Sequence, residues 1–188
     1  LDALNDPRFK YHYKDTGGLS DARNYGLKVS GGSWIAFIDQ DDLWDGVKLE
    51  KQVSVAEKDP DVDFIFTDGR WIGGVNEDMR VAAKNGLKEG IVSNTFTRLL
   101  KGNFVICSSV LFRKSVLEKV GYANPCFKIC PDYEHIIRFA EYTDFYFINS
   151  VLVSYRIHGA NTVKNRLKES AEVILLLCDR KIITKMQK

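Results

Sequence analysis

The sequence predicts an α/β fold in which a mainly parallel central sheet is flanked by helices. Strand-like apolar segments at residues 34–38 and 62–67 alternate with amphipathic helical segments at residues 20–29 and 47–58. Strands separated by helices in this order are typical of α/β proteins with a parallel sheet. The length of 188 residues suits one domain with a sizeable core.

Turn and capping residues set the expected limits of the early elements. Ser20 is a candidate N-cap for the first helix, and Gly31-Gly32 is expected to end it. The second helix is expected to end near Pro60. Residues 9–13 are expected to form a short strand, and residues 62–67 are a nearly continuous apolar run of the kind that is buried on both faces.

The second half of the chain is less regular. Residues 72–90 are polar and contain glycine, so we expect a hairpin or loop there. Further strands are expected at residues 105–113 and 145–155, and helices at residues 115–120, 132–142 and 166–186. Because no repeat or linker interrupts the sequence, we predict one domain over residues 1–165, followed by a C-terminal amphipathic helix over residues 166–188.

The composition excludes several classes of protein. The chain is 45% hydrophobic and 28% charged, as in ordinary soluble proteins, and its net charge of +2 does not suggest a nucleic-acid partner. No apolar run reaches the roughly 20 residues of a membrane-spanning helix, and no signal peptide opens the chain, so a cytoplasmic location is expected. The four cysteines are too scattered for a disulfide scaffold, and reduced thiols are expected.

The most informative segment is the strand-like run that ends in Asp39, Asp41 and Asp42. Clustered carboxylates repel one another unless they are solvated, paired with basic side chains or bound to a divalent metal. The carboxyl end of a strand is also where open α/β sheets place their ligands. The residues alone leave two interpretations open: a metal-dependent ligand site, and a solvated turn that caps the next helix.

Several short blocks of sequence together carry a family resemblance. They are, in order, Gly18-Leu-Ser-Asp-Ala-Arg-Asn-Tyr-Gly, Trp34-Ile-Ala-Phe-Ile-Asp-Gln-Asp-Asp-Leu-Trp, Lys48-Leu-Glu, Ser108-Ser-Val-Leu-Phe-Arg-Lys, Pro131-Asp-Tyr-Glu-His and Tyr155-Arg-Ile-His-Gly-Ala-Asn. In this order and spacing they closely resemble the family 2 glycosyltransferases with the A-type fold, over roughly residues 9–162. The resemblance implies a nucleotide-diphospho-sugar transferase-like fold.

The resemblance also implies a domain that is incomplete at its N-terminus. Family members usually open with an apolar strand and a Pro-Thr-Tyr-Asn turn, followed by a second strand that ends in Asp-Asp-Gly-Ser, and neither is present in this sequence. The Glu-Asp pair that usually precedes the acceptor-side helix is Pro131-Asp132 here. We therefore expect that the chain by itself is not an active transferase.

Glycosyl transfer requires charge neutralisation on the departing diphosphate and removal of a proton from the attacking hydroxyl. The resemblance implies Mn²⁺ or Mg²⁺ as cofactor, with Asp41 as the metal ligand, Asp42 as the alternative ligand and Asp39 directed towards the donor ribose. It also implies Asp132 as the general base, although a residue that follows Pro131 at a helix start can equally be an N-terminal cap.

Four further side chains are candidates for binding the donor. Arg23 and Asn24 open a helix where they can meet anionic groups, but Arg23 can also simply pair with Asp21 or with an acid of the turn. Arg156 is expected to balance phosphate charge. His158 is expected to approach the metal or the diphosphate, with a structural role as the alternative.

The expected function is metal-dependent, inverting transfer of a sugar from a nucleotide-diphosphate donor to a saccharide or lipid-linked acceptor, in bacterial polysaccharide or glycolipid synthesis. Trp44 and Trp71 are candidates for stacking on a sugar, with core packing as the default. The basic end of residues 166–188 suggests contact with the inner face of an anionic membrane, packing onto the domain, or a homodimer. A non-catalytic, oligomer-forming remnant is the alternative; a nucleotidyltransferase would need a Gly-rich phosphate-binding signature that the chain lacks.

Overall fold

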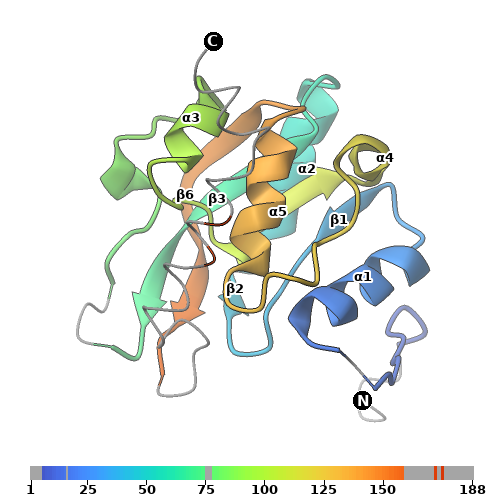
Figure 1. Ribbon diagram of the computed structural model, residues 1–188. Coiled ribbons are helices and arrows are strands. Elements are labelled where there is room, and N and C mark those ends of the chain that lie inside the picture. Colours follow the sequence, from blue (N-terminus) through green and yellow to red (C-terminus); the bar gives the residue numbers. More distant parts are fainter. Residues whose placement is uncertain (1–5, 16, 75–77, 159–171, 173–174, 176–188) are drawn as a thin grey trace.

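The computed structural model of the protein describes residues 6–15, 17–74, 78–158, 172 and 175. Within them a six-stranded sheet is covered by helices (Figure 1), with strand order β1-β5-β3-β6-β2 and with β4 also paired to β6. The strands are β1 (Trp34–Ala36), β2 (Leu43–Trp44), β3 (Phe64–Ile72), β4 (Gly90–Val92), β5 (Val110–Arg113) and β6 (Phe145–Arg156). The α-helices are α1 (Leu19–Val29), α2 (Lys48–Lys58), α3 (Thr95–Leu99), α4 (Leu117–Val120) and α5 (Pro131–Ala140), and 3₁₀ turns cover Ala83–Asn85, Cys107–Ser109 and Lys114–Val116.

The α/β class is confirmed, but the predicted mainly parallel sheet is wrong for the described strands. Only β3 and β6 pair in parallel; the pairs β1–β5, β3–β5, β2–β6 and β4–β6 are antiparallel. β1, β3 and β6 do run in the same direction, as the alternation of helices and strands predicts. The sheet is mixed because β5, inserted between β1 and β3, runs in the opposite direction, and so do β2 and β4 beside β6.

The first described segment does not form the predicted strand at residues 9–13. Phe9, Tyr11 and Tyr13 are 57%, 71% and 74% exposed, and no described strand pairs with their backbone. A strand requires a neighbour to satisfy its backbone groups. An apolar, aromatic composition was therefore insufficient evidence for this element.

Two other boundaries also differ from the prediction. Gly18 rather than Ser20 precedes helix α1; Ser20 lies in the first turn, where its hydroxyl donates to the Asn124 carbonyl at 3.2 Å. The strand expected over residues 105–113 is limited to β5. A 3₁₀ turn occupies Cys107–Ser109, and the Ser109 hydroxyl stabilises it by donating to the Ile106 carbonyl at 2.7 Å.

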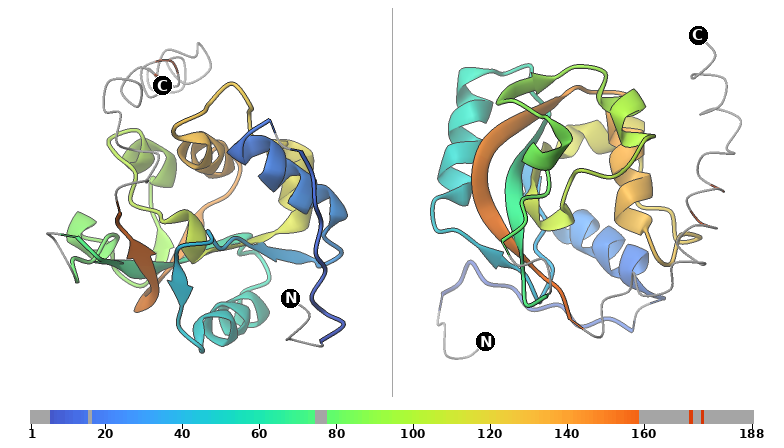
Figure 2. Two further views of the ribbon diagram at one scale, coloured as in Figure 1. Left: turned by 90° about the horizontal axis from the view of Figure 1, so that it is seen from below. Right: turned by 90° about the vertical axis from the view of Figure 1, so that its left-hand side faces the viewer.

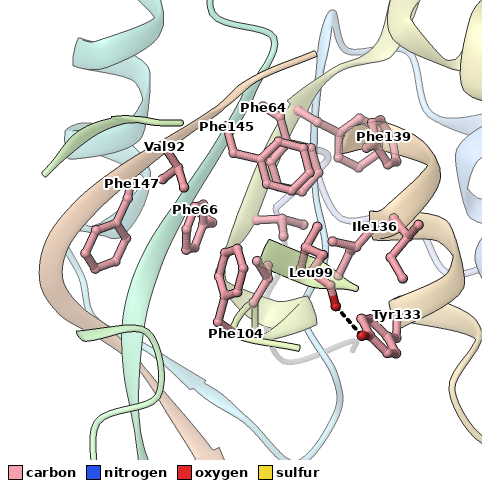
Figure 3. Packing of buried hydrophobic residues seen from close by; sticks show 14 of the residues in the cluster. Phe64, Phe66, Val92, Leu99, Phe104, Tyr133, Ile136, Phe139, Phe145 and Phe147 are labelled. Carbon is pink, nitrogen blue, oxygen red and sulfur yellow. Dashed lines mark hydrogen bonds between the residues drawn. The ribbon is translucent and has the colours of Figure 1, made fainter. Parts of the chain in front are cut away.

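Helix α2 covers one face of the sheet, and α1, α3 and α5 cover the other (Figure 2). Successive side chains of a strand point to opposite faces of the sheet. Phe64 and Phe66 of β3 therefore pack towards α5, and Ile65 packs towards α2. Figure 3 shows the aromatic cluster on the α5 side, in which the rings of Phe64 and Phe145 stack with centroids 3.8 Å apart. This core holds one side of α5 against the sheet.

Tyr133 connects this core to the N-terminal end of α5. Its buried side chain packs in the cluster, and its hydroxyl donates to the Leu99 carbonyl at the end of α3 (Figure 3). Asp132 is the preceding residue, so the packing of Tyr133 fixes the position of the backbone that carries Asp132.

A buried carboxylate organises the loop that follows β3. Asp68 lies at a register shift between β3 and β6, and its two oxygens accept backbone N–H groups from Gly69, Val81, Ala82 and Ala83. The guanidinium of Arg80 adds an ion pair. The loop predicted at residues 72–90 is confirmed for the described residues between β3 and β4, and Asp68 holds residues 80–83 of it against the sheet.

The predicted helices at residues 47–58 and 132–142 and the predicted strand at residues 145–155 are confirmed, with ends shifted by one or two residues. The predicted helix at residues 166–186 lies outside the described residues, apart from Glu172 and Leu175. Among the helices that the structure describes, none is long and apolar enough to cross a membrane.

Candidate functional site

The predicted acidic residues lie in a turn between β1 and β2, which we call the acid turn (residues 39–42). The Asp42 N–H donates to the Asp39 carbonyl at 3.1 Å and closes the turn. The three carboxylates have different surroundings: Asp39 and Asp41 are partly exposed, whereas Asp42 is only 5% exposed. The three carboxylates therefore do not all face solvent, and they cannot all be reached by one ligand.

Asp39 is paired with a buried arginine from helix α1. The Arg23 Nη2 lies 2.8 Å from Asp39 Oδ1, so pairing with an acid of the turn, one of the two alternatives for Arg23, is what the structure shows. The other terminal nitrogen of Arg23, Nη1, is buried and has no hydrogen-bond partner among the described residues. Arg23 also lines a cavity of about 20 Å³ with Asp132 and His135, which is large enough for one water molecule.

Asp41 lies beside the residue at the end of β6 that sequence analysis selected as a metal ligand. The His158 Nε2 is 2.8 Å from Asp41 Oδ2, and both side chains remain partly exposed. The Arg156 Nε donates to the backbone carbonyl of Asp41 at 3.0 Å. The structure therefore brings Asp41, Arg156 and His158 together from segments more than 110 residues apart.

Asp42 uses both of its carboxylate oxygens inside the protein. Oδ2 accepts the Ser108 hydroxyl at 2.6 Å, and Oδ1 accepts the backbone N–H of Arg156 at 3.0 Å. Burial raises the pKa of Asp42, while these two hydrogen bonds partly offset the rise. Of the two acids predicted as metal ligands, Asp41 is therefore the better placed to meet an external ion.

Asp132 lies in the first turn of α5, with Cys130 as the capping residue. It lines a cleft of about 560 Å³ together with Asp39, Trp71 and Tyr155. Burial raises the pKa of the Asp132 carboxyl, the positive charge of Arg23 lowers it, and Asp39 raises it. A carboxylate with a raised pKa beside a cleft has the properties of a general base.

Asn24 and Trp44 have structural contacts instead of contacts with the cleft. The Asn24 amide donates to the Ala123 carbonyl and accepts the Ala123 N–H, both at 2.9 Å, so it joins α1 to the segment before α5. The Trp44 indole donates to the Ser108 carbonyl at 2.7 Å. Trp71, in contrast, does line the cleft.

Sequence analysis did not identify Tyr155 or Ser108 as site residues. Burial and the neighbouring carboxylates, Asp42 and Asp132 among them, raise the pKa of Tyr155 to about 12, so its side chain is a neutral hydroxyl in the cleft. Ser108 is fully buried against the acid turn. Both residues lie in the sequence blocks that carry the family resemblance, but only the fold brings them to the acids.

The donors present are suited to a metal ion that is also bound by a substrate. Among the described residues, no group of three or more His, Cys, Asp and Glu side chains could by itself hold a metal ion. Asp41 and His158 offer one carboxylate and one imidazole at the protein surface. Mg²⁺ usually takes one or two carboxylates and fills its other positions with phosphate and water, and Mn²⁺ also prefers oxygen ligands.

The comparison with known families decides the identity. The model of glycosyl transferase family 2 matches residues 1–121, well over half of the chain. The chain belongs to glycosyl transferase family 2. An uncharacterised glycosyltransferase of Rickettsia typhi is 28% identical over 173 residues, which cover 86% of this chain and 51% of the relative. One from Methanocaldococcus jannaschii is 24% identical over 153 residues, covering 81% and 51%.

Solved structures confirm the A-type glycosyltransferase fold of this family 2 member. TarS from S. aureus with bound UDP-GlcNAc matches with a TM-score of 0.65 at 13% identity, over 88% of this chain and 48% of TarS. TarS with bound UDP matches with a TM-score of 0.61 at 16% identity, over 86% and 44%. The chain spans about half the length of the two relatives and the two TarS structures named above.

Proposed function

We propose that this family 2 glycosyltransferase transfers a sugar from a nucleotide-diphosphate donor, with inversion and with the help of Mn²⁺ or Mg²⁺. The proposal rests on one observation: Asp39 of the acid turn and Asp132 of α5 line the same cleft of about 560 Å³. A donor-binding acid and a general base must share a cleft if the two substrates are to react in line.

The donor side of the proposal depends on the acid turn. Asp39, oriented by Arg23, is suited to hydrogen-bond the hydroxyls of a ribose. A divalent cation held by Asp41 and His158 would neutralise the negative charge of the departing diphosphate. The complexes of TarS with UDP and UDP-GlcNAc support a uridine-diphosphate sugar as the first donor to test.

The acceptor side depends on Asp132. Its carboxylate accepts the proton of the attacking hydroxyl, and its raised pKa makes it a stronger base than an exposed aspartate. The Tyr155 hydroxyl and the Trp71 ring line the same cleft and are suited to hydrogen-bond and stack on a sugar. We propose a saccharide or a lipid-linked saccharide as acceptor, and contact of residues 166–188 with a membrane belongs to the same proposal.

Calorimetric titration of the chain with UDP, with and without Mn²⁺, tests the donor side. We expect binding that depends on Mn²⁺ and that is lost when the metal is removed with a chelator. GDP and ADP serve as controls for the choice of base. Absence of metal-dependent binding for all three nucleotides would favour the alternative of a non-catalytic, oligomer-forming module.

A further inference from the structure

Ser108 contacts the acid turn at two points and the following strand β2 at a third. Its hydroxyl oxygen accepts the backbone N–H of Asp39 at 3.0 Å, and the hydroxyl donates to Asp42 Oδ2 at 2.6 Å. Its carbonyl accepts the indole N–H of Trp44 at 2.7 Å. Ser108 lies 64 to 69 residues from these partners in the sequence and is fully buried. Ser108 therefore fixes the first and last residues of the acid turn, and Trp44 of β2, relative to one another.

The polarity of these hydrogen bonds is fixed by chemistry. A serine hydroxyl has one proton to donate, and the bond from the Asp39 amide already uses the oxygen as acceptor. The hydroxyl proton is then donated to Asp42, because an ionised carboxylate has no proton of its own and acts only as an acceptor. A buried charge satisfied in this way is held in one geometry, because leaving it without a donor is costly.

The second oxygen of Asp42 extends this link to β6. It accepts the Arg156 N–H at 3.0 Å, two residues before His158. The ladder between β2 and β6 ends at the pair Leu43–Ser154, so it does not itself reach His158. Beyond the last β2–β6 pair, two hydrogen bonds join the acid turn to Arg156 of β6. The Asp42 carboxylate accepts the Arg156 N–H, and the Asp41 carbonyl accepts the Arg156 Nε–H.

We propose that Ser108 and Asp42 form a positioning clamp that sets the distance between Asp41 and His158 and thereby prepares that pair for a metal–nucleotide complex. The clamp deepens the proposed function and rests on it for the identity of the ligand. Neither Ser108 nor Asp42 touches the metal or the substrate in this proposal. Asp42 is accordingly a positioning residue, not the alternative metal ligand.

The test compares Ser108→Ala with Ser109→Ala. The two serines are neighbours, both are fully buried, and both donate a hydrogen bond, but the hydroxyl of Ser109 goes to the Ile106 carbonyl and not to the acid turn. We expect Ser108→Ala to weaken Mn²⁺-dependent UDP binding by about 10- to 100-fold, the usual effect of losing a group that orients a metal ligand. Ser109→Ala should weaken this affinity far less than Ser108→Ala, because the Ser109 hydroxyl makes its hydrogen bond within the 3₁₀ turn and none to the acid turn. Equal affinities for the two variants would overturn the clamp.

A second readout needs neither metal nor nucleotide. In ¹⁵N-histidine-labelled protein, the ring signals of His158, assigned by their loss in His158→Gln, should shift in Ser108→Ala because the contact with Asp41 loosens. They should remain unchanged in Ser109→Ala. If the parent binds no UDP, the proposed function fails, but the shift of His158 still decides the clamp: identical spectra for both serine variants would refute it.

Asp42→Asn completes the design. The Ser108 hydroxyl and the Arg156 N–H donate to different oxygens of Asp42, and in the amide one of these positions becomes an NH₂ group that cannot accept, so the clamp loses one of its two bonds. If the two residues act as a unit, the effects of Ser108→Ala and Asp42→Asn on affinity should be non-additive in the double variant. Fully additive losses would show independent roles. If Ser108→Ala fails to fold, Ser108→Cys, which keeps a weak donor, should give an intermediate loss, and parent-like binding by that variant would overturn the proposal.

Discussion

The Oδ2 atom of Asp41 lies 2.8 Å from the Nε2 atom of His158, although the two residues are 117 positions apart in the sequence. The acid turn supplies the first residue and the end of β6 supplies the second. Both side chains remain partly exposed, so their donor atoms can reach a ligand from solvent. The pair is the structural feature on which the proposed metal-dependent donor site rests.

Replacing either member of this pair should remove the metal dependence of nucleotide binding. We expect Asp41→Ala and His158→Ala each to reduce Mn²⁺-dependent UDP affinity by at least the roughly 10- to 100-fold that is typical for loss of an outer-shell partner. Calorimetric titration measures the effect. His12→Ala is the matched control, because His12 is an exposed histidine whose ring contacts Tyr25 and not the acid turn. Parent-like affinity in both site variants would exclude this pair as the metal ligands.

Replacing Asp132 should separate sugar transfer from donor binding. Asp132→Asn keeps the shape of the side chain but cannot accept the proton of the acceptor. In an enzyme that also carries the N-terminal strands usual in the family, we expect transfer to fall by about 10²- to 10⁴-fold while UDP affinity is retained. Rate measurements with the donor in excess, combined with titration of UDP, distinguish the two effects.

The pH dependence gives an independent check on Asp132. Because burial raises its pKa, the rate of transfer should fall on acidification at a higher pH than an exposed aspartate, with a pKa near 3.9, would give. Asp144→Asn, a change at an exposed acid after α5, should leave both rate and pH profile as in the parent. A rate for Asp132→Asn equal to that of this control would place the base elsewhere.

Lys48 should make the stability of the protein depend on pH. Its side chain is fully buried, donates to Gln52 Oε1 at 2.8 Å and lies 4.1 Å from the ring centre of Trp44, with no carboxylate partner among the described residues. Burial lowers the pKa of Lys48 to about 7, whereas the unfolded chain keeps a value near 10.4. Between these two values the unfolded state binds more protons, so the free energy of unfolding should rise with pH.

Lys48→Met should abolish this contribution. Denaturant unfolding of parent and variant at pH 6.5, 8 and 9.5 measures it, and we expect the variant to lose stability relative to the parent as the pH rises. Lys51→Met alters an exposed lysine of the same helix and should not change the slope. Identical slopes for the parent and both variants would show that Lys48 titrates in the folded protein as it does in the unfolded chain.

Glu172 should stabilise the start of α5. Its carboxylate accepts backbone N–H groups from Lys128, Ile129 and Cys130 at 2.7, 2.8 and 3.0 Å. Burial alone would raise the pKa of Glu172, but these donors outweigh it and hold the pKa below its ordinary value. We expect Glu172→Ala to cost about 1 kcal/mol in the free energy of unfolding, as for loss of a helix cap.

The sign of the pH effect follows from the lowered pKa. The stabilisation by Glu172 should be present above the ordinary glutamate value of about 4.3 and should be lost as the pH falls through the lower value of the folded protein. Denaturant unfolding of the parent, Glu172→Ala and the exposed control Glu118→Gln at pH 7 and pH 3 measures it. A difference from the parent that persists unchanged at pH 3 would mean that the carboxylate charge is not the cause.

The sequence by itself determined the local elements and most of the candidate chemistry. Amphipathic period and turn residues located α1, α2 and α5, and the acid turn and Asp132 were recognisable because their residue types are required by the chemistry of the family. These features depend on neighbours in the sequence, and local pattern is sufficient to find them.

Only the tertiary structure decided which of these residues meet. The insertion of the antiparallel strand β5 between β1 and β3 contributes to the mixed sheet and brings Ser108 against the acid turn. The parallel pairing of β3 with β6 carries Tyr155 and His158 to the same place. Asp41 and Asp42 are adjacent in the sequence, yet one is partly exposed and the other is buried with both oxygens occupied, because burial and hydrogen bonding depend on long-range pairing that no local pattern encodes.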